Sequence, residues 1–108
     1  MLSIVIPAYN EKNKIKTTIK KTRNFLEDRD ILFEIIVIDD GSVDNTRKIC
    51  QDLEVKLNSQ RKNKGKGYSV REGVQIAGGN YILFMDADLA TSLSAIERFW
   101  QQRKKYDV

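Results

Sequence analysis

Histidine is absent from this chain of 108 residues, and cysteine and proline each occur once. Without histidine the protein lacks the commonest general base, the triads that depend on it and any histidine-ligated zinc ion. The lone cysteine, Cys50, cannot form an internal disulfide, and its place on the apolar side of a predicted helix is typical of a small buried side chain. Any chemistry must therefore use carboxylates, amines and the backbone.

Long hydrophobic runs are also missing, since no apolar segment approaches the length that crosses a bilayer. The first residues, MLSIVIPAYNEK, lack the basic region and the small-residue cleavage site of a secretory signal. Apolar residues make up 41% of the chain and charged residues 31%, a balance typical of globular domains. We therefore expect residues 1–108 to form a single cytoplasmic domain or part of one.

Positive charge exceeds negative charge, with a net value of +4. The lysines and arginines cluster in residues 12–23, 61–66 and 103–105. Such clusters occur in nucleic-acid-binding proteins, but no recognisable reading helix or aromatic-bearing sheet accompanies them here. In the first cluster Ile15, Ile19 and Leu26 recur at helical spacing, which predicts a buried face and leaves the lysines in water. A solvated helix face is the simpler interpretation, and we expect no nucleic acid partner.

Short β-branched segments alternate with helical patterns along the chain. The predicted strands are residues 3–6, 34–38, 54–57 and 81–85, and the predicted helices are residues 12–28, a second from about 44, 67–77 and 92–106. In the third helix Val70, Val74 and Ala77 are expected to face the core. This alternation predicts a three-layer α/β/α fold with a mostly parallel sheet.

The turns that follow the predicted strands are rich in acidic residues. Ligands bind parallel sheets at the carboxyl ends of the strands, where the strand order reverses. With a strand order of 3-2-1-4, three of these turns border one crevice, and they comprise residues 7–11, 39–42 and 86–88. Four or five carboxylates would then converge in a chain that is basic overall, which favours a bound cation.

Two carboxylates lie one residue apart in NYILFMDADLAT, residues 80–91, directly after an apparently buried strand. Side chains at positions i and i+2 of an extended backbone point to the same side, so Asp86 and Asp88 suit a hard divalent ion such as Mg²⁺ or Mn²⁺. Alternatively the two acids cap the next helix, although Asp88 lies too far before Ser92 for the simplest cap. An Asp-x-Asp pair is frequent by chance, and its position after a strand is what favours the metal.

A second segment, NKGKGYSVREG at residues 63–73, places basic residues around a predicted helix start. Backbone N–H groups together with Lys64, Lys66 and Arg71 can hold a diphosphate there. The spacing is not that of a P-loop, and the segment could equally be an ordinary flexible loop.

Tyr9 follows the first predicted strand and offers an aromatic surface. Its ring can stack on a base while Asp39 accepts a hydrogen bond from a ring N–H. Alternatively Tyr9 packs at the rim of the sheet, and Asp44 or Asn45 caps the second helix.

Three segments, SIVIPAYNE, EIIVIDDGSVDNT and GNYILFMDADLAT, in this order and spacing resemble the nucleotide-binding half of family 2 glycosyltransferases of the GT-A fold. The resemblance implies inverting transfer of a sugar from a nucleotide-diphosphate donor, assisted by Mg²⁺ or Mn²⁺. The residues that match the family's nucleotide positions are Pro7, Tyr9, Glu11, Val37, Asp39, Asp86 and Ala87. Asp86 and Asp88 match its metal motif, with Asp88 as the direct ligand, and we add Asp40, Lys66 and Arg71 as candidate nucleotide-binding residues.

The segments NKGKGYSVREG and DADLAT look like those of polyprenyl-phosphate glycosyltransferases, and more like the dolichyl-phosphate glucosyltransferase branch than the mannosyltransferase branch. This similarity implies UDP-glucose as donor and a lipid phosphate or other glycan acceptor. A GDP-mannose-dependent mannosyltransferase or a transferase of cell-envelope polysaccharide synthesis is the alternative. An acceptor phosphate, with a second pKa of ~6, is already anionic and needs no strong base.

Members of this family continue past the point where KKYDV ends the present chain, and residues 106–108 look like the start of a further strand. We therefore expect only the donor half here, without the acceptor site, a catalytic base or a membrane-associating helix. No catalytic residue is assigned, and we expect weak nucleotide binding and no turnover. The full-length protein is expected at the cytoplasmic face of a membrane, and the unfinished sheet is expected to self-associate.

A non-enzymatic alternative is a phosphoacceptor receiver domain, in which one strand ends in an acidic pair and another ends in the phosphorylated aspartate. IIVIDDGS and LFMDADLA fit this pattern superficially. The acidic pair, however, follows the second strand rather than the first, and the residues after Asp86 are too few for the further strands and the lysine that such a domain needs.

Overall fold

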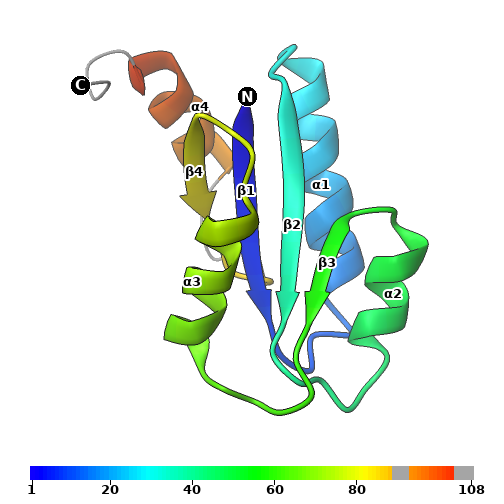
Figure 1. The fold of residues 1–108 in the computed structure, drawn as a ribbon. Helices are drawn as coiled ribbons and strands as arrows, with labels where there is room; N and C mark the ends of the chain where they lie inside the picture. The colour runs from blue at the N-terminus through cyan, green and yellow to red at the C-terminus, as the bar shows by residue number, and fades with distance from the viewer. Residues whose placement is uncertain (89–92, 104–108) are drawn as a thin grey trace.

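The computed structural model describes residues 1–88 and 93–103, and within them strands and helices alternate along the chain (Figure 1). The elements are β1 (Leu2–Ala8), α1 (Ile15–Asp28), β2 (Phe33–Asp39), α2 (Thr46–Asp52), β3 (Lys56–Ser59), α3 (Lys66–Ile76), β4 (Tyr81–Phe84) and α4 (Leu93–Gln102). The strands form one parallel sheet in the order β3-β2-β1-β4. The predicted fold class is confirmed, and the strand order is the one for which three acidic turns border one crevice.

Alternate residues of β1 face opposite sides of the sheet and create three layers. Leu2, Ile4 and Ile6 join the larger core, which α1, α2 and α4 cover. Val5 joins Ile36 and Ile38 of β2 in a smaller cluster that packs under the end of α3. Figure 1 shows α3 across the face of the sheet opposite to α1. The sheet is thus buried on both faces, as near-continuous apolar strands require.

The carboxyl ends of the strands lie at one edge of the sheet. Ala8 of β1 pairs with Asp39 of β2, and Asp39 pairs in turn with Ser59 of β3. The strand order reverses between β1 and β4, so the turns after these two strands diverge and leave a crevice between them. This edge is the lower end of the molecule in Figure 1, toward which the strand arrows point.

The buried face of α3 differs from the prediction. Ser69 and Gly73 are its buried residues, whereas Val74 is 46% exposed. The physical reason is the close approach of α3 to β1, because a Cβ atom at Gly73 would lie only 2.3 Å from Cγ1 of Val5. Small residues therefore form the closest contact, and the prediction is wrong for Val74, whereas Ala77 packs against the smaller cluster as expected.

Two strand predictions also need correction. β3 begins at Lys56 rather than at Glu54, because Glu54 adopts a left-handed conformation with φ 57° in the turn that ends α2. β4 is an end strand of the sheet and not a fully buried one, and Phe84 is 40% exposed. The predicted helix start at Ser92 and the predicted strand start at 106–108 lie outside the described residues.

Cys50 lies in the larger core, as expected. Burial, with a smaller contribution from the Asp39 carboxylate, raises the pKa of its thiol to about 11. A thiol with so high a pKa is not a nucleophile at neutral pH. No helix within residues 1–88 and 93–103 combines the length and hydrophobicity of a membrane span.

Candidate functional site

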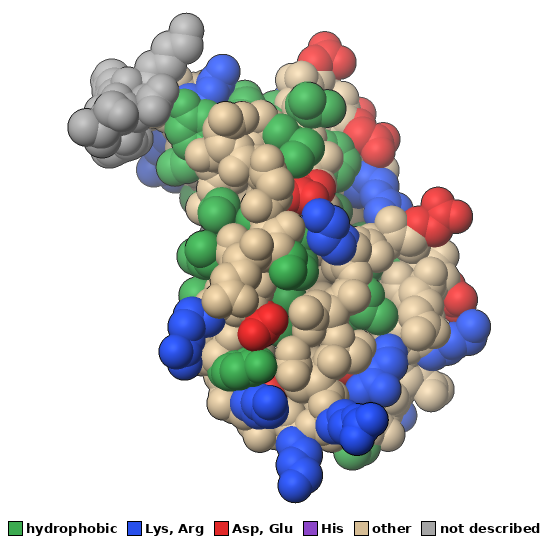
Figure 2. Space-filling model, in the orientation of Figure 1, with side chains coloured by type: hydrophobic (Ala, Val, Ile, Leu, Met, Phe, Trp, Pro, Cys, Tyr) green, Lys and Arg blue, Asp and Glu red, His purple; other side chains and the backbone are tan. Residues whose placement is uncertain are grey.

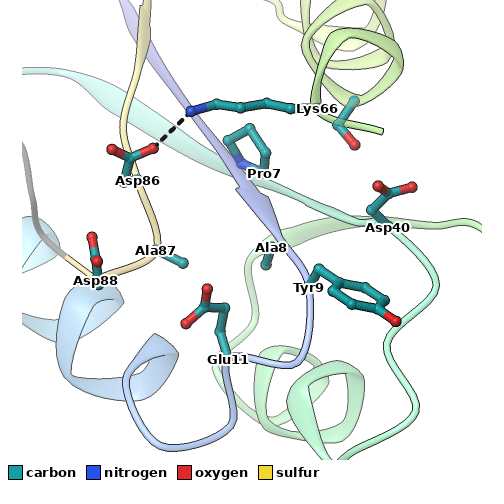
Figure 3. Close-up of a pocket in the computed structure, with 10 residues that line it drawn as sticks. Pro7, Ala8, Tyr9, Glu11, Asp40, Lys66, Asp86, Ala87 and Asp88 are labelled. Atoms are coloured by element: carbon teal, nitrogen blue, oxygen red, sulfur yellow. Dashed lines mark hydrogen bonds and ion pairs between the residues drawn. The ribbon is translucent and has the colours of Figure 1, made fainter. Parts of the chain in front are cut away.

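The turns after β1, β2 and β4 and the first turn of α3 enclose a pocket of about 240 Å³ (Figure 3). Its lining residues are Pro7, Ala8, Tyr9, Glu11, Asp40, Lys66, Ser69, Asp86, Ala87 and Asp88. Figure 3 shows Asp86, Asp88 and Glu11 toward one side of this pocket and Tyr9 and Asp40 toward the other. Most of the site residues predicted from the sequence therefore meet here, drawn from four separate segments.

Four predicted residues do not line this pocket, and one of them is Lys64, in the loop before α3. Val37 is fully buried in the larger core, Asp39 is fully buried at the end of β2, and Arg71 is exposed farther along α3. Their predicted roles in nucleotide binding stay predictions.

Asp39 is held by two hydrogen bonds. Its Oδ1 accepts from the Ser42 N–H at 3.1 Å, and its Oδ2 accepts from Arg47 Nε at 3.1 Å. Arg47 also donates to the Gln60 carbonyl, so this cation links β2, α2 and the loop after β3. Sequence reasoning did not identify Arg47, because its partner lies on a different element.

Asp40, the next residue, fixes the start of α3. Its carboxylate accepts from the N–H groups of Lys64 at 2.7 Å and Gly65 at 2.9 Å. Gly65 precedes α3 with a φ of 94°, which a residue with a side chain rarely adopts. The contact places Lys66 and Ser69, one turn apart on α3, at the pocket.

The turns after β1 and β2 are bound to each other. Asn10, in the left-handed region at φ 52°, donates its N–H to the Ser42 hydroxyl oxygen, and its Oδ1 accepts from the Val43 N–H. The Thr46 hydroxyl accepts from the Glu11 N–H at 2.8 Å, and this bond holds Glu11 beside the pocket. The loop that carries Tyr9 and Glu11 is thus braced by the loop after β2.

Asp44 supports the start of α2, as one of the alternatives proposed. Its Oδ1 accepts from the Thr46 N–H at 2.9 Å, whereas the Asn45 side chain makes no capping hydrogen bond. Burial by itself would raise the pKa of Asp44, but hydrogen bonds from the Thr46 hydroxyl and N–H and from the Lys12 N–H hold it below its usual range.

Tyr9 remains 44% exposed at the pocket, so its ring surface is accessible.

Lys66 reaches across the pocket to the turn after β4. Its Nζ lies 3.0 Å from Oδ1 of Asp86, the contact drawn in Figure 3. Both side chains are substantially exposed, so the ion pair contributes little to stability. It does place one positive charge among the pocket's carboxylates.

Further basic residues surround the same end of the molecule. Figure 2 shows blue side chains gathered toward its lower end, where Figure 1 places the loop between β3 and α3. Arg61, Lys62 and Lys64 of that loop are exposed. Lys64 Nζ lies 4.7 Å from the ring centre of Tyr68. This end of the molecule is therefore basic at its surface, while carboxylates predominate in the pocket lining.

The pocket lining fits a hard divalent cation in the chemistry of its donors. Carboxylates of Asp86, Asp88 and Glu11 border one side of the space, and oxygen ligands are those that Mg²⁺ and Mn²⁺ prefer. Among residues 1–88 and 93–103, however, no three acidic or cysteine side chains come together as a complete metal-binding group. Such an ion would take one or two protein carboxylates, with its other positions open to water or phosphate oxygens.

Thr18 of α1 supports the turn that carries Asp86 and Asp88. Its buried hydroxyl donates to the Ala87 carbonyl at 2.5 Å, between the two aspartates. One turn later the Thr22 hydroxyl contacts Met85 Sδ at 3.7 Å. Sequence reasoning missed Thr18, since nothing local marks a contact with a residue so distant in the chain.

Ser69 was also missed, although a signal for it exists. It lies three residues after Lys66, so a helix that presents Lys66 to the pocket presents Ser69 to the same side.

The chain resembles a known family and several curated proteins along most of its length. The family model of Glycosyl transferase family 2 matches residues 3–108. A dolichyl-phosphate beta-glucosyltransferase of Saccharomyces cerevisiae is 39% identical over 108 residues, which cover 90% of this chain and 32% of that protein. A dolichyl-phosphate beta-glucosyltransferase of Mus musculus is 38% identical over 109 residues, covering 90% and 34%. The chain therefore spans about a third of the length of the curated relatives that it matches.

Solved structures share the same fold. TarS of S. aureus, residues 1–349 in complex with UDP, superimposes with a TM-score of 0.72 and 26% identity, covering 94% of this chain and 32% of that one. Glucosyl-3-phosphoglycerate synthase of Mycobacterium tuberculosis, in complex with Mn²⁺, UDP and glucosyl-3-phosphoglycerate, gives a TM-score of 0.69 and 26% identity, covering 81% and 33%. A divalent metal and UDP are thus present together in a structural neighbour.

Proposed function

The chain belongs to glycosyltransferase family 2, and we propose that it forms the donor-binding part of an inverting enzyme that transfers glucose from UDP-glucose to dolichyl phosphate. The pocket at the carboxyl ends of β1, β2 and β4 is the observation that carries this proposal. It lies at the reversal of strand order, where parallel sheets bind ligands, and it combines a ring surface, carboxylates and a lysine. Family membership rules out the receiver-domain alternative.

The choice of donor and acceptor rests on the relatives. Those of yeast and mouse carry the name dolichyl-phosphate beta-glucosyltransferase, and solved neighbours contain UDP. A GDP-mannose-dependent mannosyltransferase is the second candidate, and the choice of nucleotide distinguishes the two. Since dolichyl phosphate is a lipid, we also propose that the whole protein works at the cytoplasmic face of a membrane.

Each side of the pocket has a role in this proposal. Tyr9 and Pro7 border the base and ribose, with Asp40 holding α3 in place beside them. Lys66 balances the negative charge of the diphosphate as it leaves. An oxygen of the acceptor phosphate attacks the anomeric carbon of glucose, and the bond from that carbon to the diphosphate breaks, with its electron pair leaving on UDP.

A divalent cation completes the donor site. Asp88 and Asp86 would hold it, with Glu11 close by. A bound cation would supply further charge neutralisation on the departing diphosphate. Lys66 would exchange its contact with Asp86 for one with a phosphate oxygen, because both partners compete for the same ammonium group.

Calorimetric titration of UDP, and separately of GDP, into the 108-residue chain with and without Mn²⁺ tests the proposal. We expect weak binding of UDP that requires Mn²⁺, and we expect Asp88→Ala to reduce UDP affinity at least ~10-fold, as loss of a charged ligand to a metal does. Asp28→Ala, an exposed position at the end of α1 far from the pocket, is the matched control and should leave affinity unchanged.

If the chain bound GDP in preference to UDP, the donor would be GDP-mannose, and the second candidate, a mannosyltransferase, would replace the glucosyltransferase. If the folded wild-type chain bound neither nucleotide, or if Asp88→Ala bound as tightly as Asp28→Ala, the donor site proposed here would be wrong.

A further inference from the structure

Ser69, in the first turn of α3, has an unusual environment. The residue is fully buried, and among the residues that the structure describes its hydroxyl oxygen is the one buried side-chain polar atom without a hydrogen-bond partner. It also lines the pocket at the carboxyl edge of the sheet. A buried hydroxyl without a partner is unfavourable, so such an atom requires an explanation.

Other buried hydroxyl groups of the described chain do have partners. Ser3 donates to Glu34 and accepts from the Gly79 N–H, Thr18 donates to the Ala87 carbonyl, and Thr46 donates to Asp44. The Gly65 carbonyl, the usual local partner of a serine in a helix, accepts from the Ser69 backbone N–H but not from its hydroxyl. Close packing of α3 on the sheet explains a small residue at this position, but no contact within the described chain explains its hydroxyl group.

The part of the pocket that Tyr9 and Asp40 border favours a neutral polar group over an anionic one. Asp40, which lines the same side of the pocket as Tyr9, would repel an anion, and its oxygens are already occupied by the Lys64 and Gly65 N–H groups. Lys66, by contrast, extends its ammonium group away from α3 to Asp86. The positive charge of Lys66 thus lies at the turn after β4, away from the helix that carries Ser69.

Access to the first turn of α3 is open at the adjoining residue. An added Cβ at Gly67 would meet no heavy atom within 4 Å, so the start of the helix is open to solvent beside the two residues, Lys66 and Ser69, that line the pocket.

We propose that the Ser69 hydroxyl hydrogen-bonds the nucleoside part of the donor, its base or its ribose, and so contributes to the recognition of the nucleotide. The inference rests on the proposed function, and it adds a contact that the sequence did not predict. The missing partner of Ser69 is then supplied by the ligand, while the diphosphate lies nearer to Lys66 and Asp86.

The test compares Ser69→Ala with wild type in three measurements: the affinity for UDP with Mn²⁺ by calorimetry, the affinity for uridine by NMR titration, and thermal unfolding without ligand. We expect both affinities to fall by about fivefold to tenfold, the usual effect of one lost hydrogen bond. We also expect the unfolding temperature to stay the same or rise, since alanine removes an unpartnered hydroxyl and favours the helix.

Ser3→Ala is the matched control, because Ser3 is equally buried but its hydroxyl is fully partnered. This variant should lower the unfolding temperature and leave the affinity of the folded protein unchanged. Ser3→Ala should thus lose stability and keep its affinity, whereas Ser69→Ala should keep its stability and lose affinity. This contrast distinguishes the loss of a structural hydroxyl from the loss of a ligand contact.

The inference would be overturned if Ser69→Ala bound both UDP and uridine as tightly as wild type does. It would also be overturned if Ser69→Ala lost affinity for UDP but kept its affinity for uridine, because the contact would then be with the diphosphate. In both cases wild type still binds UDP and the proposed function stands. A wild-type chain that binds neither UDP nor uridine would instead overturn the proposed function, and this inference with it.

Discussion

At the scale of single residues, the hydroxyl of Thr18 links α1 to the turn that carries Asp86 and Asp88. The Ala87 carbonyl that it holds is buried, as is the hydroxyl itself. On the sheet side, the turn is joined to β1 through the Met85 N–H, which donates to the Val5 carbonyl. These two contacts fix the backbone on either side of Asp86, so Thr18 is a positioning residue for both aspartates.

Replacement of Thr18 by valine should therefore affect stability and ligand binding together. The isosteric change leaves the buried Ala87 carbonyl without its donor, which should cost about 1–3 kcal/mol in the free energy of unfolding. Mn²⁺-dependent affinity for UDP should fall several-fold in protein that remains folded, because the aspartates lose a fixed orientation. Urea unfolding and calorimetry measure the two effects.

Two control variants separate this role from ordinary packing. Thr18→Ser keeps the hydroxyl and should restore most of the affinity, whereas Thr22→Val removes only the weak contact with Met85 Sδ and should change affinity little. Equal affinities of Thr18→Val and Thr18→Ser would contradict the positioning role.

At the scale of elements, the packing of α3 on β1 depends on Gly73. The helix lies so close to the sheet that a Cβ atom there would approach Val5 Cγ1 to 2.3 Å. This close approach brings the first turn of α3, with Lys66 and Ser69, to the edge of β1 and so to the pocket. The geometry of the site is therefore sensitive to one small residue in the middle of the helix.

Gly73→Ala should destabilise the protein by about 1–3 kcal/mol, the usual cost of overpacking, even though alanine is the better helix former. Val5→Ala in the same chain should relieve part of this cost, so the double variant should be more stable than the sum of the single effects predicts. Denaturant unfolding of the four proteins measures the coupling.

Gly67→Ala serves as the matched control for this prediction. It places the same methyl group on α3 in open space, and it should leave stability unchanged or raise it by about 0.5–1 kcal/mol. A Gly73→Ala variant as stable as Gly67→Ala would show that the contact between helix and sheet is looser than described.

At the scale of the whole molecule, Glu34 joins four segments at the edge of the sheet opposite to the pocket. From β2 its carboxylate accepts from Ser3 of β1 at 2.6 Å and from the Gly78 N–H before β4 at 2.6 Å, and it lies 3.0 Å from Lys56 of β3. Burial by itself would raise the pKa of Glu34, but these hydrogen bonds and the charge of Lys56 lower it below the ordinary value of 4.5.

The lowered pKa predicts a specific loss of stability in acid. Because the folded pKa lies below the unfolded value of 4.5, ionised Glu34 stabilises the protein fully above that pH, and its contribution disappears as the pH falls through the folded pKa. Glu34→Gln should therefore be less stable than wild type at pH 6, and the difference should shrink toward pH 3. Urea unfolding at pH 6, 4.5 and 3 measures it.

Glu27→Gln, at an exposed position on α1, is the control and should show a much smaller difference that changes little with pH. If the difference in the free energy of unfolding between wild type and Glu34→Gln stayed constant from pH 6 to pH 3, the ionised state of Glu34 would not contribute to stability, and the prediction would be wrong.

The sequence alone determined the features that depend on local pattern. Alternation of apolar strands with amphipathic helices established the parallel sheet, and the order of acidic turns after the strands indicated which residues would meet at its carboxyl edge. Most of the predicted site residues do line one pocket, because parallel strands in register end at the same edge. The family could be named from the same motifs, since their order and spacing are specific.

Only the tertiary structure decided the contacts between residues that are distant in the chain. It paired Asp39 with Arg47 and Thr18 with Ala87, and it left Ser69 buried at the pocket without a partner. It also placed Ser69 and Gly73 of α3 against the sheet, although the spacing of the valines in this helix had predicted a different buried face. These features escape prediction because a hydrogen bond or a close packing contact depends on where another element lies, which local sequence does not encode.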